Sequence, residues 1–346
     1  MRIITRRHLL PVVAVLALSA CGGTTASSGS GGTAQAAPTA MKIMVGGLNK
    51  QIYLPNMLTQ QLGYFKDQNL DVTLIDEGSG QGSETEVVAG NVDAGSGSYS
   101  HTIELQAKGK NIETICQFGI APGEAEMLAS AKASSISKVS DLKGKNLGVT
   151  DIGSGTQTLT QALLGKQGIS ADQSTYVAVG AGNTFIAAIK QGKIDAGMTT
   201  EPTISRLLQT GDAKVLVDLR TPASTRAALG GDYPFIGIFA QNDWVNSHKD
   251  AAQRLVNAYT KTLQWMKAHT AEEIAAKMPA DYYAGDQNLY VTALKNQLQI
   301  FGGDCKMPPA GPETSLQIEQ QFVSSFKGKT ADLTKTYTND FASAAR

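Results

Sequence analysis

A six-residue motif that occurs twice in the sequence constrains the fold of this chain more than any other feature. Gly90-Asn91-Val92-Asp93-Ala94-Gly95 is repeated, with conservative changes, as Gly192-Lys193-Ile194-Asp195-Ala196-Gly197. Each copy follows a short apolar helical segment and precedes a loop and another helical segment. Because a repeated motif with the same flanking pattern indicates a repeated supersecondary unit, the sequence predicts two similarly built α/β lobes.

Apolar runs of strand length alternate with helix-length segments around these motifs, which is typical of α/β proteins. A chain of 346 residues also exceeds the usual size of a single core. We expect parallel sheets covered on both faces by helices. The predicted strands are residues 42–48, 71–75, 92–95 and 112–118 in the first lobe, and 127–131, 147–150, 175–179, 196–199 and 215–219 in the second.

The predicted domain bounds follow from this pattern. Residues 41–122 form the first part of lobe 1, residues 123–233 form lobe 2, and residues 234–346 return to lobe 1 and end in helices that pack on it. A helix over 55–67 is expected to end at Asn69 in a left-handed conformation. Ser247 and Asp250 form a pair resembling a capping box at the start of a later helix.

The N-terminus has the pattern of an export signal. Arg2, Arg6 and Arg7 precede an apolar stretch over residues 9–18 that is too short to span a bilayer. Leu18-Ser19-Ala20-Cys21 resembles the bacterial lipobox, which implies a lipoprotein signal peptide over residues 1–20 and acylation of Cys21. The alternative is an ordinary secretory signal with an incidental cysteine. The sequence leaves open whether export is general-secretory or twin-arginine.

Residues 21–40 consist almost entirely of Gly, Ser, Thr and Ala after Cys21, and they predict a flexible tether. A lipid anchor followed by a tether places the folded part outside the cytoplasm, attached to the cell membrane. Cys116 and Cys305 are the other cysteines. Disulfides form in such a compartment, but the sequence does not decide whether these two cysteines pair.

A predicted strand over 146–150 runs into a glycine-rich turn and a helix over 157–168. Backbone N–H groups at a helix start lack partners within the helix, and the helix dipole favours negative charge there. Ser154, Gly155 and Thr156 therefore predict a site for a ligand's oxyanion. The alternative is that Ser154 or Thr156 only caps its own helix.

Charge and histidine spacing exclude other classes of protein. The 30 basic and 30 acidic residues balance, which argues against a nucleic-acid partner. His8, His101, His248 and His269 lack metal-ligand spacing, and the sequence has no Cys-x-x-Cys pair. We expect no metal and no cofactor.

Several short motifs, taken in order, resemble one family. They are Leu62-Gly63-Tyr64-Phe65, Leu70-Asp71-Val72, Asp141-Leu142-Lys143-Gly144-Lys145, Gly153-Ser154 and Glu201-Pro202, together with the two repeated motifs. They are similar to the solute-binding proteins of ABC importers in the nitrate/sulfonate/taurine/thiamine-precursor group, over about residues 41–245. One departure is Asn69, where the family usually has glycine.

This resemblance implies a bilobal, type II periplasmic-binding-protein-like fold whose lobes close on a small-molecule solute. It also implies an ABC permease and its ATPase as partners, and we expect a monomer. The implied ligand-binding residues lie in loops after strands: Asn49, Gln51, Ser98, Tyr99, Ser154, Gly155, Thr156 and Glu201, with His101 beside Tyr99. Tyr99 stacks on ligand or packs the cleft wall, and His101 contacts ligand or faces solvent. Glu201 pairs with a cationic ligand group or only favours its helix dipole.

The rival function is an enzyme on the same fold, similar to the pyrimidine-precursor synthases or menaquinone-pathway enzymes. No nucleophile–base pair is visible at a recognisable spacing, so we expect a binding protein and not an enzyme. The solute is expected to be a sulfonate, carboxylate or related anion, and its identity remains open.

Overall fold

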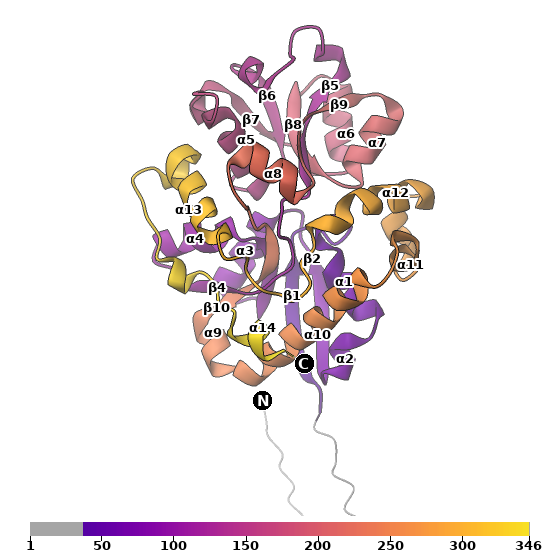
Figure 1. Cartoon of the computed structure of the whole chain (residues 1–346), viewed down its shortest axis with the longest axis vertical. Coiled ribbons are helices and arrows are strands. Elements are labelled where there is room, and N and C mark those ends of the chain that lie inside the picture. Colours follow the sequence, from indigo (N-terminus) through magenta and orange to yellow (C-terminus); the bar gives the residue numbers. More distant parts are fainter. Residues whose placement is uncertain (1–36, 346) are drawn as a thin grey trace, which may run out of the picture. The chain divides into compact units, whose positions relative to one another are not determined.

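Residues 37–345 are described by a computed structural model and form two five-stranded sheets surrounded by helices (Figure 1). The first sheet has the order β2-β1-β3-β10-β4 and the second the order β7-β6-β8-β5-β9. If β6 to β9 are matched with β1 to β4, the two orders are the same. The predicted repeat of an α/β unit is therefore confirmed, and so is the type II periplasmic-binding-protein-like fold.

The strand bounds follow the chain order. Lobe 1 contains β1 (Thr39–Val45), β2 (Leu70–Asp76), β3 (Ala94–Ser98), β4 (Ile112–Gln117) and β10 (Ile236–Gln241). Lobe 2 contains β5 (Glu124–Ala129), β6 (Asn146–Val149), β7 (Thr175–Ala178), β8 (Ala196–Thr200) and β9 (Ala213–Leu219).

The aspartates of the two repeated motifs have the same structural role. Asp93 Oδ2 accepts a hydrogen bond from the backbone N–H of Lys42 (2.8 Å), and Asp195 Oδ2 accepts one from Asn146 (2.9 Å). The backbone N–H groups of the same aspartates donate to the carbonyls of Lys42 and Asn146. Each aspartate thus fixes the start of the central strand of its sheet, β3 or β8, against the neighbouring strand, β1 or β6.

The prediction of purely parallel sheets was wrong, because each sheet contains one strand of opposite direction. β10 is antiparallel to β3 and β4, and β5 is antiparallel to β8 and β9. β10 and β5 each follow a segment that crosses over from the other lobe. Each therefore begins at the cleft edge of its sheet, where the neighbouring strand β3 or β8 ends. A strand entering from that edge has to run away from it, so its direction is reversed.

Helices cover both sheets. Those of residues 54–107 are α1 (Leu54–Gln61), α2 (Tyr64–Asp67), α3 (Gly80–Ala89) and α4 (Ser100–Ala107), and those of residues 155–229 are α5 (Gly155–Gly165), α6 (Asn183–Lys190), α7 (Thr203–Thr210) and α8 (Pro222–Leu229). The C-terminal part contains α9 (Asn242–Ser247), α10 (Lys249–Lys267), α11 (Ala271–Ala275), α12 (Gln287–Gln297), α13 (Gly311–Phe322) and α14 (Asp340–Ala344). Tyr259 of α10 is fully buried in the core of lobe 1, against the rings of Phe65 and Phe118.

Of three local features predicted from the sequence, the structure contains one as predicted. Asn69 has the predicted left-handed conformation (φ 52°). The helix over 55–67 is interrupted at Gly63, whose φ of 78° belongs to the same region. The predicted capping pair is not formed, because Ser247 Oγ donates to the Asp243 carbonyl within α9 (2.7 Å).

The segment predicted as a tether overlaps the first strand. β1 begins at Thr39, and Thr39 and Ala40 pair with Leu70 and Asp71 of β2. Strand pairing thus orders the last residues of a segment whose composition alone predicted flexibility. The predicted signal peptide and Cys21 lie outside the described residues. Among the described residues, no helix is long and apolar enough to cross a membrane.

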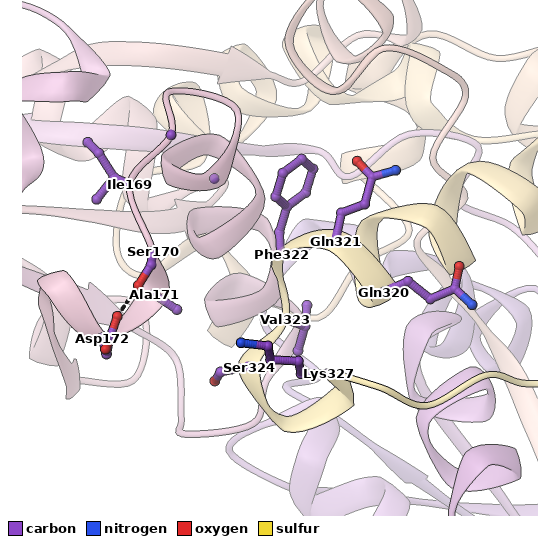
Figure 2. A pocket seen from close by; sticks show the side chains of 12 residues that line it. Ile169, Ser170, Ala171, Asp172, Gln320, Gln321, Phe322, Val323, Ser324 and Lys327 are labelled. Carbon is purple, nitrogen blue, oxygen red and sulfur yellow. Dashed lines mark hydrogen bonds between the residues drawn. The ribbon is translucent and has the colours of Figure 1, made fainter.

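The C-terminal helices contact both lobes, although they were predicted to pack on lobe 1. α13 packs against α4 of lobe 1 and α5 of lobe 2, and α12 also contacts α7. Figure 2 shows Phe322 at the end of α13 beside a groove of about 490 Å³ whose other wall includes Ile169. The apolar face of α13 is therefore shared between the lobes.

Cys116 of β4 and Cys305 form a disulfide, a pairing that the sequence left open. Their Cα atoms lie 4.5 Å apart, and the carbonyl of Cys305 accepts a hydrogen bond from the Gln117 N–H (2.8 Å). The bond attaches the segment that leads into α13 to the strand from which the chain crosses into lobe 2.

Candidate ligand-binding site

A small cavity of about 20 Å³ lies where strands of both lobes meet. It is lined by lobe 1, lobe 2 and the segments between them: Lys50, Ile52, Tyr53, Gly80, Ser98, His101, Glu124, Thr150, Ser154, Gly155, Thr156, Phe235 and Ile236. The lobes touch around it, since Ser79 Oγ donates to Asp151 Oδ2 (3.3 Å) and the Gln51 N–H donates to the Glu201 carbonyl (3.1 Å). The structure therefore describes lobes closed on a cleft.

The wall from lobe 2 is the start of α5, where the sequence predicted an oxyanion site. Ser154 occupies the N-cap position, but its side chain makes no capping hydrogen bond. Its hydroxyl donates to the Asp151 carbonyl (2.7 Å) and lies 2.7 Å from Thr156 Oγ1, which accepts from the Thr150 N–H. These hydroxyls therefore hold the turn. Among the described residues, the N–H groups of Gly155 and Thr156 find no acceptor, so they remain free for a ligand.

His101 supplies a donor from the opposite lobe. Its side chain is 1% exposed, and Nδ1 lies 3.1 Å from Glu84 Oε2. Burial acts to lower the pKa of His101, but the hydrogen bonding and charge of Glu84 outweigh it, so the pKa is raised. Within residues 37–345, Nε2 has no hydrogen-bond partner. A protonated His101 thus presents one free N–H where it lines the cavity.

Lys50 is buried on the same side. Its Nζ donates to the carbonyls of Gly46 (2.8 Å) and Gly78 (2.9 Å). Burial lowers its pKa to about 8, against the opposing charge of Glu124. Lys50 therefore adds positive charge to the cavity wall at neutral pH while two of its three donors are already used.

Glu124 and Glu126 lie at the start of β5, two residues apart and therefore on the same face of the sheet, since side chains alternate along a strand. Glu124 lines the cavity, whereas Glu126 Oε2 accepts a hydrogen bond from Thr160 (2.9 Å). Burial raises the pKa of each carboxyl to about 8. Both side chains therefore hold a proton in the folded protein at neutral pH.

Glu126 makes the stability of the protein dependent on pH. Its folded-state pKa is above the ordinary value, so the stability that it contributes is complete below about pH 4.5 and is lost as the pH rises toward 8. One such group changes the free energy of unfolding by up to about 1.4 kcal/mol per pH unit. Glu126→Gln is therefore expected to gain stability relative to the wild type between pH 5 and 8. Urea unfolding at three pH values measures this, and parallel curves for the two proteins would contradict it.

Five of the predicted ligand-binding residues line the cavity, namely Ser98, His101, Ser154, Gly155 and Thr156. Asn49 lines a neighbouring cavity of about 370 Å³ that shares Lys50 with the first. Gln51 is buried and donates through Nε2 to the Tyr290 carbonyl (2.9 Å).

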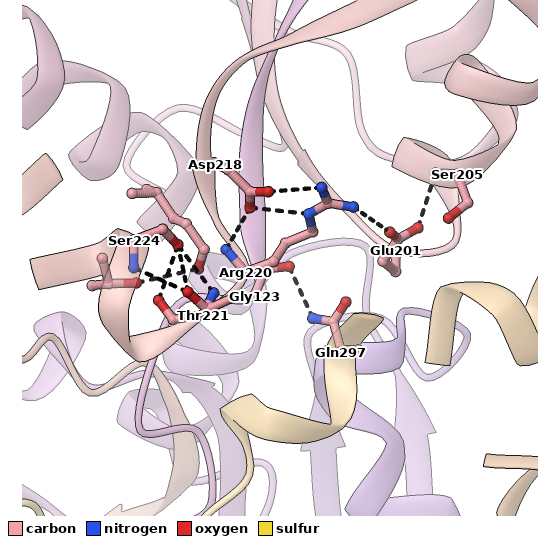
Figure 3. A network of polar contacts seen from close by, with 10 residues as sticks. Gly123, Glu201, Ser205, Asp218, Arg220, Thr221, Ser224 and Gln297 are labelled. Carbon is pink, nitrogen blue, oxygen red and sulfur yellow. Dashed lines mark hydrogen bonds and ion pairs between the residues drawn. The ribbon is translucent and has the colours of Figure 1, made fainter. Parts of the chain in front are cut away.

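Tyr99 and Glu201 are not brought to the cavity. The Tyr99 ring is fully buried, and its hydroxyl lies 2.6 Å from Thr336 Oγ1 near the C-terminus. Both carboxylate oxygens of Glu201 are used, one by Arg220 (3.0 Å) and one by the Ser205 N–H (2.9 Å), as Figure 3 shows. Arg220 also binds Asp218 (2.7 Å). Glu201 thus stabilises lobe 2 close to its contact with lobe 1.

Sequence reasoning missed four polar residues of the cavity, namely Lys50, Tyr53, Glu124 and Thr150. A signal for Lys50 was present, because it lies between two predicted contacts, Asn49 and Gln51. The signal for Glu124 was the pair of acidic residues, Glu124 and Glu126, directly before the apolar run over residues 127–129. The predicted strand began at residue 127, which left both glutamates in a loop.

The family model described as NMT1/THI5 like matches residues 52–273. The chain belongs to the NMT1/THI5-like family. A 4-amino-5-hydroxymethyl-2-methylpyrimidine phosphate synthase from Candida albicans (strain WO-1) is 28% identical over 64% of this chain and 65% of its own length. The THI13 synthase of Saccharomyces cerevisiae is 30% identical over 43% of this chain and 42% of its own. The matches thus span between two fifths and two thirds of these relatives.

Solved structures match over most of the described residues. A protein from Bordetella bronchiseptica RB50 is 32% identical, with a TM-score of 0.84, over 88% of this chain and 96% of that one. The alkanesulfonate-binding protein SsuA from Xanthomonas axonopodis pv. citri bound to MOPS has a TM-score of 0.69 at 16% identity, over 88% and 100% of the two chains. The nitrate-binding protein NrtA from Synechocystis PCC 6803 has a TM-score of 0.71 at 13% identity, over 89% and 88%. The last two share the fold.

Proposed function

We propose that this protein is the extracytoplasmic solute-binding component of an ABC importer and that it captures a small organic anion between its lobes. One observation carries the proposal: among the described residues, free N–H donors converge on one cavity from both lobes, at Gly155 and Thr156 of α5 and at His101 of α4. An oxyanion between them accepts hydrogen bonds from both lobes at once. The bound solute thereby holds the lobes closed.

The delivery step rests on the N-terminal signals. We propose that Cys21 carries a lipid and that residues 22–38 tether the folded part, as a monomer, to the outer face of the cell membrane. The closed protein then delivers its solute to a permease that an ATPase drives. Fold likeness to sulfonate- and nitrate-binding proteins supports this assignment.

The test is binding of anions by calorimetry to the wild type and to Ser154→Ala. Because Ser154 Oγ holds the turn that presents the free N–H groups, its loss is expected to weaken the affinity about tenfold, or about 1.4 kcal/mol. The panel comprises sulfonates, carboxylates, phosphates and nitrate, and melting temperatures without ligand report on stability. A lower melting temperature with unchanged affinity would show that Ser154 only supports its helix.

A second candidate function is an enzyme of the synthase type found among the curated relatives. The observation that favours it is the presence of three buried groups with shifted pKa values, Lys50, His101 and Glu124, in one cavity. We favour binding without chemistry, because none of the described serine hydroxyls that line the cavity is hydrogen-bonded to His101. Mass spectrometry of the solute after long incubation separates the two, since a binding protein returns it unchanged.

A further inference from the structure

We propose that the bound solute carries, besides its oxyanion, a positively charged nitrogen that donates a hydrogen bond to Glu124. Glu124 is then the residue that selects amino-bearing anions over plain ones. This inference rests on the anion-binding function proposed above.

The free polar atoms of the cavity are of two kinds. Gly155, Thr156 and His101 present N–H donors, which an oxyanion satisfies. The carboxyl of Glu124 is 2% exposed, and its Oε2 has no hydrogen-bond partner among residues 37–345. Once ionised, this carboxyl presents acceptors only, which is the opposite kind. A plain anion satisfies the N–H donors but has no donor for an ionised Glu124.

Two other buried glutamates have donors, because Glu84 lies against His101 and Glu201 accepts from Arg220 and the backbone. Glu126 accepts from Thr160 through one oxygen only, and both oxygens of Glu319 are without a partner among residues 37–345, but neither residue lines the cavity. Lys50 is the cation whose charge lowers the pKa of Glu124, but its ammonium group donates hydrogen bonds to the carbonyls of Gly46 and Gly78. The protein itself therefore leaves the acceptor on Glu124 open toward the cavity.

The charges around Glu124 are consistent with this inference. Burial raises the pKa of Glu124 to about 8, Lys50 opposes that rise and Glu126 adds to it. A positively charged nitrogen next to the carboxyl lowers the pKa of Glu124, as Lys50 does, and so favours the ionised form of Glu124. The cavity of about 20 Å³ is smaller than such a solute, so the lobes close less far around it. An amino-bearing anion then has both of its charges paired between the lobes.

The experiment compares matched anions that differ by one amino group. The pairs are 2-aminoethanesulfonate and ethanesulfonate, β-alanine and propionate, and 2-aminoethyl phosphate and ethyl phosphate. For the wild type, we expect at least one pair in which the amino-bearing member binds about tenfold more tightly or better. Glu124→Gln removes the negative charge but keeps the shape, and it is expected to abolish that preference. Its affinity for the plain anion should stay within about threefold.

Glu126→Gln is the matched control. Glu126 lies two residues further along the same strand, is equally buried and does not line the cavity, so its loss should leave the preference intact. Plain anions that bind as tightly as their amino partners, or a preference that survives in Glu124→Gln, would overturn the inference and leave the anion site standing. The surviving preference would mean that Glu124 binds as a neutral donor, a role that the amide of glutamine can take. Failure of every anion to bind the wild type at millimolar concentration would overturn the proposed function and this inference together.

Discussion

Replacing Gly155 with valine is expected to lower the affinity for the solute about a hundredfold or more. A Cβ atom at this position would lie 2.8 Å from the ring of Phe235 and 3.1 Å from Cβ of Ser98, both outside lobe 2. Carbon atoms do not approach so closely, so the start of α5 could not reach its place against lobe 1. The variant keeps a folded lobe 2 but closes poorly on an anion, and its side chain crowds the free N–H groups.

Calorimetry with an anion that binds the wild type measures the loss, and Gly155→Ala provides the graded control. Alanine adds only the Cβ atom, so its effect should be smaller than that of valine and larger than the experimental error. Thermal unfolding without ligand separates closure from folding. Wild-type affinity in the valine variant would contradict the role of this contact.

Removing the disulfide is expected to cost about 2–5 kcal/mol of the free energy of unfolding. Cys116 and Cys305 are 189 positions apart, so their bond closes a very long loop in the unfolded chain. Both are 1% exposed and neither lines the cavity. The double variant Cys116→Ala, Cys305→Ala should therefore lose stability while keeping its affinity for the solute.

Urea unfolding of both proteins, with and without a reductant, tests this expectation. The reductant should shift the wild type toward the double variant and should leave the double variant unchanged. Equal midpoints for the oxidised wild type and the double variant would show that the bond adds no stability.

The two-lobed α/β architecture could be predicted from the sequence, because the information that specifies it is local and periodic. The two copies of Gly-x-(Val/Ile)-Asp-Ala-Gly mark equivalent places in two sheets of the same strand order. Each aspartate acts within its own lobe on the neighbouring strand, so the motif indicates the unit without knowledge of the rest of the fold. The turn at residues 153–156 and the start of α5 were predictable for the same reason, since a strand, a glycine-rich turn and a helix follow each other directly. Their role as an oxyanion site stays a prediction.

Only the tertiary structure decided which side chains face the cleft and which are already satisfied. Tyr99 and Glu201 follow strands as binding residues do, but Thr336 and Arg220 occupy their polar atoms. Glu124 is adjacent to the crossover between lobes, and only the pairing of β5 with β8 and β9 turns it toward the cavity. The pairing of Cys116 with Cys305 depends on the placement of the segment before α13 against β4. These outcomes depend on contacts between distant residues, which the local pattern around each residue does not contain.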